Sequence, residues 1–249
     1  MRPRGHHVTL CYHAVSEAWN DPLAVSPDVF AWQVRSLLRR GLRAVDTAGV
    51  LAGERGTFHV TFDDAYAGIR PALELLASLR VPATVFACSA LAEAGDPLVL
   101  AELAGRADGH EDELVTMGWD ELAAVAEGPV EIGSHTVTHA HLPALADAEL
   151  ERELRGSRER IESALGRPCR LVAYPFGEHD ARVRSAARAA GYSAGFGLGR
   201  RRGERGAFAL PRVDVYRGTG SLRFRTRTSS LDAPARTAGA LVRRVRRGR

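Results

Sequence analysis

Apolar and polar positions alternate along this chain with two different periods. Short apolar runs bounded by glycine, proline or charged residues are typical of buried strands, and the longer amphipathic stretches between them are typical of helices. We expect seven strands, at 7–13, 57–62, 83–88, 130–133, 170–173, 193–196 and 208–213. We expect helices at 26–40, 69–79, 120–126, 147–165 and 180–190. Strands that alternate with helices in this way predict an α/β fold with a parallel sheet.

Local signals set several of these boundaries. Ser26 followed by Pro27 predicts the start of the first helix, and Gly41 is expected to end it. Asp147 is expected to cap the long helix that runs to residue 165. The segment 92–116 is polar and acidic, so we expect a long loop over one face of the fold.

The length of 249 residues fits one α/β domain, which we place at 1–225 and follow with an arginine-rich, flexible tail at 226–249. The formal net charge of +4 is a property of this tail, because 236–249 hold six arginines and no acid and the rest of the chain carries −2. We therefore expect no binding to nucleic acid. A basic amphipathic helix in the tail could contact anionic lipid, but we favour a solvated tail.

The three cysteines, Cys11, Cys88 and Cys169, are far apart, and each lies in an apolar run. This arrangement predicts buried, reduced thiols rather than a disulfide framework. No apolar run approaches ~18 residues, so we expect no transmembrane helix. The basic N-terminus leads into the first strand without the apolar segment of a signal peptide, so we expect a cytoplasmic protein.

Two adjacent carboxylates, Asp63 and Asp64, directly follow the apolar run at 57–62. Successive strand side chains point in opposite directions, so the two acids can take different roles. His135 and His139 follow another predicted strand, and their spacing would put both imidazoles on one face of a helical turn. One acid and two imidazoles make three ligands for a catalytic metal and leave the second acid as a base. Alone, each pair has an ordinary alternative as turn or loop residues.

Three segments carry a resemblance to a known family: TFDDAY at 61–66, HTVTH at 135–139 and YPFG at 174–177. With these motifs in this order, the chain resembles the polysaccharide deacetylases, also called the NodB-homology family or carbohydrate esterase family four, over roughly 7–217. The resemblance implies an irregular (β/α)7 TIM-like barrel of the NodB type. Catalytic residues at the carboxyl ends of the strands are what such a barrel predicts.

The resemblance also implies a role for each site residue. Asp64, His135 and His139 would bind a divalent metal, with zinc as the expected ion. Asp63 would be the general base that takes a proton from the attacking water. The backbone N–H of Phe176 would stabilise the oxyanion of the tetrahedral intermediate, although a plain turn is the alternative for this Pro-Gly segment.

The chain departs from the family pattern at two places. Ala173 stands where many members carry an arginine that orients the catalytic aspartate, and a later Leu-Pro-Arg segment, found in a subgroup of the family, makes Arg212 the expected partner of Asp63. The usual general acid is a histidine near the C-terminus, but no histidine follows His179. The Tyr-His segment that ends at His13 resembles poly-N-acetylglucosamine deacetylases, so we expect His13 to be the acid, facing the metal across the pocket from Asp63. The alternative for Arg212 is that it is one more arginine among the 34 basic residues of the chain, and the alternative for His13 is a histidine that only packs or only makes a hydrogen bond.

We therefore expect a metal-dependent hydrolase that removes the N-acetyl group from an N-acetylated amino sugar of a saccharide and releases acetate. The alternatives are an inactive NodB-like protein that binds metal or carbohydrate, and a deacetylase of a non-sugar amide. An iron oxygenase with two histidines and one carboxylate is disfavoured, because such enzymes usually have an antiparallel jelly roll and Asp63 would have no role. Aromatic residues are only 6% of the chain, which favours a small or lipid-linked glycan over a crystalline polysaccharide.

Overall fold

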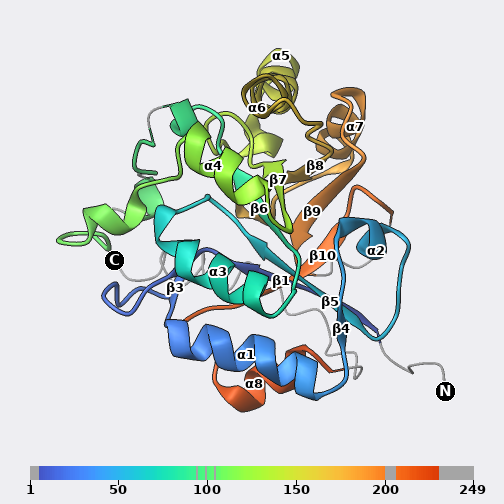
Figure 1. Cartoon of the computed structure of the whole chain (residues 1–249). Coiled ribbons are helices and arrows are strands. Elements are labelled where there is room, and N and C mark those ends of the chain that lie inside the picture. The colour runs from blue at the N-terminus through green and yellow to red at the C-terminus, as the bar shows by residue number, and fades with distance from the viewer. Residues whose placement is uncertain (1–5, 94, 99, 104, 200–205, 230–249) are drawn as a thin grey trace.

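The computed structural model describes residues 6–93, 95–98, 100–103, 105–199 and 206–229. Seven parallel strands form a closed ring in the order β1, β10, β9, β8, β7, β6, β5, because β1 pairs with both β10 and β5 (Figure 1). Their bounds are β1 His7–Tyr12, β5 Thr57–Phe62, β6 Ala83–Ala87, β7 Val130–Ser134, β8 Leu171–Ala173, β9 Ala194–Leu198 and β10 Leu210–Asp214. The predicted (β/α)7 barrel and its seven strands are confirmed.

Strand β1 closes the barrel between β10 and β5. Leu10 aligns with Val213 of β10 on one edge and with Val60 of β5 on the other. The edge of β5 that faces away from β1 pairs with the short strand Arg43–Ala44 at the start of β5 and with β6 at its end. Three short strands, which the sequence pattern did not predict, are β2 Ala14–Val15, β3 Ala24–Val25 and β4 Arg43–Ala44.

Most of the helices cover the outside of the barrel (Figure 1). Their bounds are α1 Pro27–Arg39, α2 Thr47–Leu51, α3 Arg70–Ser78, α4 Trp119–Ala126, α5 Asp147–Glu151, α6 Ser157–Leu165, α7 Ala181–Ala189 and α8 Ser221–Arg227. The predicted long helix at 147–165 is continuous, but its middle, Arg152–Gly156, is π-helical. The prediction that Asp147 caps it is wrong, because Asp147 is its first residue and the side chain of Glu149 accepts from the N–H of Ala146 (3.4 Å).

Strand side chains point alternately toward the helices and into the barrel. On β6, Ala83 and Val85 pack in the large apolar cluster shared with the helices, whereas Phe86 packs inside the barrel against Phe196 of β9, with ring centroids 5.6 Å apart. Val50 of α2 belongs to the same interior cluster, so this short helix closes the amino-terminal end of the barrel. Burial on both faces explains why the strands read as continuous apolar runs.

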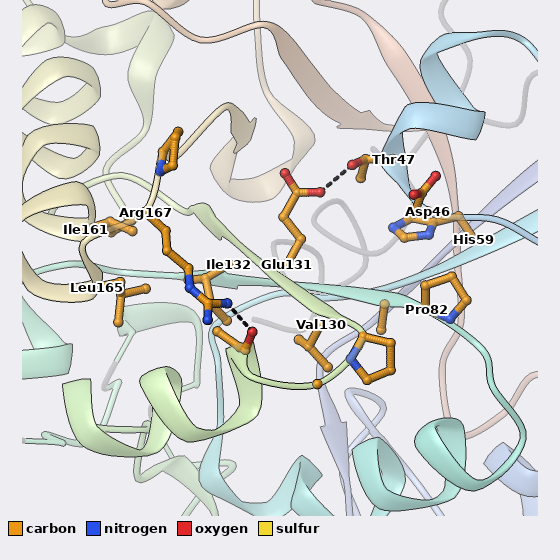
Figure 2. A pocket seen from close by; sticks show the side chains of 15 residues that line it. Asp46, Thr47, His59, Pro82, Val130, Glu131, Ile132, Ile161, Leu165 and Arg167 are labelled. Carbon is orange, nitrogen blue, oxygen red and sulfur yellow. Dashed lines mark hydrogen bonds between the residues drawn. The ribbon is translucent and has the colours of Figure 1, made fainter.

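A pocket of about 400 Å³ lies beside α2, near the amino-terminal ends of β6 and β7 (Figure 2). Glu131 reaches across it and accepts a hydrogen bond from the hydroxyl of Thr47, and Asp46, His59 and Arg167 are among its lining residues. This pocket is at the end of the barrel opposite to the predicted catalytic residues. In (β/α) barrels the amino-terminal face contributes to stability, and catalysis takes place at the other end.

The sequence predicts a long loop over one face of the fold at 92–116. The described residues of this segment fold into short 3-10 turns rather than an extended loop, and Thr116 pairs with Tyr66, which follows β5. The segment's side chains Leu98 and Leu114 form a small apolar cluster with Trp19 and Tyr66. Helix α8 extends across the predicted domain boundary after residue 225, and 230–249 of the predicted tail lie outside the described residues.

The expectation for the cysteines is met in the part of the chain that the structure describes. Cys11, Cys88 and Cys169 are buried free thiols. None of the described helices combines the length and the apolar character that crossing a bilayer requires.

Candidate active site

The predicted site residues gather at the carboxyl ends of the strands. His13 follows β1, Asp63 and Asp64 follow β5, His135 follows β7, and Phe176 lies in the turn after β8. Asp63, Asp64 and His135 are each no more than 2% exposed. Exclusion of water strengthens the electrostatic interactions among such groups.

Asp64, His135 and His139 form the first group. Nε2 of His135 lies 3.5 Å from Oδ1 of Asp64, and Nε2 of His139 lies 3.4 Å from the same oxygen. The three ligand atoms are all within 4.8 Å of one another, and the three residues are buried. The structure therefore brings together the three residues that the sequence predicts as metal ligands.

The surroundings of these atoms fit a divalent cation. Nδ1 of His135 lies 2.8 Å from the carbonyl oxygen of Ala173, which places a proton on Nδ1 and leaves Nε2 as an acceptor that faces Asp64. Oδ1 of Asp64 is buried and has no hydrogen-bond partner among the described residues. Such an atom is costly unless a cation compensates it. One oxygen and two nitrogen ligands suit zinc or a similar ion.

Burial shifts the pKa values of all three residues in the direction that favours metal binding or is compensated by it. Burial, and then the neighbouring charge of Asp63, raise the pKa of Asp64 to about 8. Burial also lowers the pKa of His135 to about 4 and that of His139 well below its ordinary value. Neutral imidazoles are the form that binds a metal, and a divalent cation between them would favour the ionised form of Asp64.

Left-handed backbone conformations position three of the site residues. The φ angles of Asp64, His139 and Phe176 are 68°, 62° and 58°. Each such conformation costs a residue with a side chain about 1–3 kcal/mol, and these conformations cluster at functional sites. The predicted helical turn at 135–139 is wrong, because the chain is irregular there. The N–H of His139 donates to Oγ1 of Thr136 (3.1 Å), and this bend brings the two imidazoles together.

Arg212 holds Asp63, as the sequence predicts. Nη1 of Arg212 donates to Oδ1 of Asp63 (2.6 Å), and Nη2 donates to Oδ2 (2.8 Å). Nη1 also donates to Oγ1 of Thr61 (3.1 Å), which fixes the guanidinium inside the barrel. Burial by itself raises the pKa of Asp63, but the charge and hydrogen bonds of Arg212 outweigh it and hold the pKa well below its ordinary value. Asp63 therefore stays ionised in a fixed orientation.

His13 lies beside Asp63, because β1 and β5 are neighbours in the barrel. A ring nitrogen of His13 is within 4.8 Å of both the Asp63 carboxylate and Sγ of Cys11. Burial lowers the pKa of His13, and the charge of Asp63 partly opposes this effect. The ring therefore faces the site rather than the apolar core. It is next to Asp63, whereas the sequence argument placed it across the pocket.

The ring of Phe176 forms one wall of the site. It packs edge-on against His139, with centroids 4.6 Å apart, and stacks on His141, with centroids 3.9 Å apart and an angle of 6° between the rings. Nδ1 of His141 lies 3.0 Å from Oε2 of Glu178. His141 is thus a partly exposed packing residue at the rim, and the turn brings Phe176 next to a candidate ligand.

Sequence reasoning missed two groups in the site. The carbonyl of Ala173 orients His135, but every residue has a carbonyl, so nothing in the sequence marks this one. The thiol of Cys11 donates to Oδ2 of Asp63 (3.3 Å). A signal for Cys11 was present, because Cys11 and His13 are two residues apart at the end of a strand and therefore point to the same side.

The fold and the site together define a barrel protein with paired carboxylates and imidazoles at its catalytic end. Comparison with known families identifies the family to which this barrel belongs. The model of the polysaccharide deacetylase family matches residues 52–195, more than half of the chain, and the chain belongs to this family. YxkH of Bacillus subtilis (strain 168), named as a polysaccharide deacetylase, is 24% identical over 168 residues, which are 66% of this chain. The chain spans about half of that relative's length, 53%.

Solved structures share the fold. A polysaccharide deacetylase of Bacillus anthracis, BA0330, has a TM-score of 0.73 at 23% identity, over 90% of this chain and 69% of its own. The deacetylase PplD of Streptococcus pyogenes, solved in complex with acetate, has a TM-score of 0.73 at 19% identity, over 90% of this chain and 98% of its own. IcaB of Ammonifex degensii has a TM-score of 0.69 at 23% identity, over 85% of this chain and 92% of its own.

Proposed function

We propose that this protein is a metal-dependent hydrolase that removes the N-acetyl group from an N-acetylated amino sugar of a saccharide and releases acetate. The observation that carries the proposal is the pairing of two differently prepared carboxylates: Asp63 is held ionised by Arg212, and Asp64 faces two imidazoles. Membership of the polysaccharide deacetylase family supports it, as does the acetate bound to a neighbour with the same fold.

Asp64, His135 and His139 would hold the divalent ion. Bound there, the ion supplies Lewis-acid chemistry, which polarises the acetyl carbonyl and lowers the pKa of water. The hydrogen bond between His135 and the carbonyl of Ala173 keeps the ligand ring in the correct tautomer. The π-contact between Phe176 and His139 limits rotation of the second ring.

Proton transfer falls to Asp63 and His13. Asp63 takes a proton from the attacking water while the water oxygen bonds to the acetyl carbon. Because burial lowers the pKa of His13, we propose that its imidazole is neutral before the reaction and receives this proton from Asp63, which lies within 4.8 Å. His13 then gives the proton to the leaving nitrogen, and the C–N bond breaks. The N–H of Phe176 donates to the oxyanion in the intermediate.

A substrate panel tests the function. We expect the zinc-loaded protein to release acetate from N-acetylated saccharides, measured with an acetate assay on short oligosaccharides, N-acetylated monosaccharides and nucleotide sugars. Simple acetamides without a sugar serve as the comparison set. Saccharide binding without acetate release would favour the inactive binding protein. Release from the acetamides alone would favour a non-sugar amidase.

We expect His13→Ala to lower the deacetylation rate of amides by about 10²–10⁴-fold with metal content unchanged, because an amine is a poor leaving group unless protonated. An aryl acetate, whose phenolate leaves without a proton, should be hydrolysed at nearly the wild-type rate. Comparing the two substrates separates acid catalysis from structural damage, which would slow both equally. Undiminished amide hydrolysis by the variant would contradict the role of His13.

A further inference from the structure

A second group of potential metal ligands adjoins the first. Sγ of Cys11, a ring nitrogen of His13 and a carboxylate oxygen of Asp63 all lie within 4.8 Å of one another. We call these three residues the thiol cluster. Oδ2 of Asp63 is 3.9 Å from Nε2 of His135, so the cluster borders the Asp64–His135–His139 group directly. Cys11 has no part in the proposed reaction.

The geometry of the thiol cluster is close to that of a metal site. Ligand atoms around tetrahedral zinc lie roughly 3.5 Å apart, given bond lengths of ~2.0–2.3 Å. Sγ of Cys11 is already 3.3 Å from Oδ2 of Asp63. Nδ1 of His13 is buried and has no hydrogen-bond partner in the described part of the chain. Small side-chain rotations would therefore complete a set of one sulfur, one nitrogen and one oxygen ligand.

Two features make this group a weaker site than its neighbour. The guanidinium of Arg212 already contacts both oxygens of Asp63, and its charge opposes a cation. A carboxylate oxygen has two acceptor directions, however, so contact with Arg212 leaves each oxygen able to bind a metal. Burial raises the pKa of Cys11 well above its ordinary value, so its proton must be displaced when a metal binds. The cluster should fill only when metal is in excess.

We propose that Cys11, His13 and Asp63 form a second, inhibitory site for thiophilic divalent cations such as Zn²⁺ and Cd²⁺. On binding, the Cys11 thiol releases its proton to solvent and a metal–sulfur bond forms. The cation occupies the oxygen of Asp63 and the nitrogen of His13, so neither can transfer a proton. Thiolate ligands select soft ions, and Mg²⁺ should not bind there. Binding of a cation to the thiol cluster does not depend on the proposed function. Only the inhibitory effect of the bound cation rests on that function.

Cobalt(II) titration tests the binding directly. The Asp64–His135–His139 group has no sulfur ligand, so the first equivalent of Co²⁺ should give only weak visible bands. Further equivalents should add an intense thiolate-to-cobalt charge-transfer band in the near ultraviolet. This band should be absent in Cys11→Ser and unchanged in Cys169→Ser, which replaces a buried thiol outside the cluster. A wild-type protein without the band, or a Cys11→Ser protein that keeps it, would overturn the proposal.

A further variant keeps the test decisive if Cys11→Ser does not fold. In the double variant Cys88→Ser with Cys169→Ser, Cys11 is the remaining cysteine of the chain, and the charge-transfer band should persist. Loss of the band in this folded variant would also overturn the proposal. These spectra need no turnover, so they stand even if the protein hydrolyses no saccharide.

Activity measurements test the inhibition. Acetate release should fall as Zn²⁺ is raised beyond the concentration that saturates the first group, and excess Mg²⁺ should not reproduce the fall. In Cys11→Ser, with rates normalised to that variant's own maximum, the zinc concentration for half inhibition should rise about 10-fold or more. An unchanged inhibition curve would show that excess zinc acts elsewhere and would contradict the inhibitory role.

Discussion

Asp63→Asn should lower the deacetylation rate by about 10²–10⁴-fold while the metal stays bound, because an amide cannot accept a proton from water near neutral pH. The side chains of aspartate and asparagine have nearly the same shape, so the substitution should leave the ligand group of Asp64, His135 and His139 intact. Steady-state rates and elemental analysis of the same preparation check both halves of this result. A variant that loses its metal would mean that the roles of the two aspartates are reversed.

The same substitution should also destabilise the fold, because Arg212 would be left as an uncompensated charge inside the barrel. Both residues are buried, at 2% and 1% exposure. Breaking a buried pair in this way typically costs ~3–5 kcal/mol, measured as a loss of unfolding free energy in denaturant. Asp63→Asn combined with Arg212→Met should recover much of this stability and remain inactive. Asp28→Asn, at an exposed aspartate in the first turn of α1, is the matched control. It should leave the rate unchanged and lower the unfolding free energy by no more than ~1 kcal/mol, the usual contribution of an acid to the helix dipole.

His139→Ala should remove both the metal and the activity. Loss of a supporting group around a metal site costs 10–100-fold in affinity, so loss of a ligand should cost about 100-fold or more. Zinc content after dialysis, measured by elemental analysis, should fall from about one equivalent toward none. Acetate release should fall in parallel and recover only in part at high zinc concentration.

His110→Ala is the matched control for that result, because it makes the same change in the segment at 92–116, outside the ligand group. It should retain the metal and the wild-type rate. Full metal occupancy in His139→Ala would show that His139 is not a ligand. An active His139→Ala protein without metal would contradict the metal-dependent mechanism itself.

The replacement of the family's usual arginine has a structural explanation. Many members of the family carry an arginine at the position that Ala173 occupies on β8. In this chain the arginine that contacts the aspartate is Arg212, which lies on β10. In the ring of strands β10 and β5 flank β1, so the long side chain of Arg212 reaches Asp63 across the inner face of a single strand. Cys11, on that strand, is small enough to leave the path open and donates to the same carboxylate.

Local patterns in the sequence predicted the alternating strands and helices and the position of the candidate site residues, and the resemblance to a known family implied the barrel. Strand β5 begins and ends where its apolar run does, and Asp63 and Asp64 follow its last residue. Strands buried on both faces must be apolar, so their positions are visible without any structure. The small elements β2, β3 and β4 have two residues each, too few for a periodic signal.

What the sequence by itself determined was the order of elements, the identity of the ligand-type residues and the end of the barrel at which they lie. Only the tertiary structure decided how those residues meet. The irregular chain at 135–139, the left-handed conformations of Asp64 and His139, and the place of His13 beside Asp63 all depend on contacts between distant segments. Strained backbone angles of this kind are unfavourable locally and persist only because the surrounding packing imposes them. No local pattern of residues can therefore reveal them.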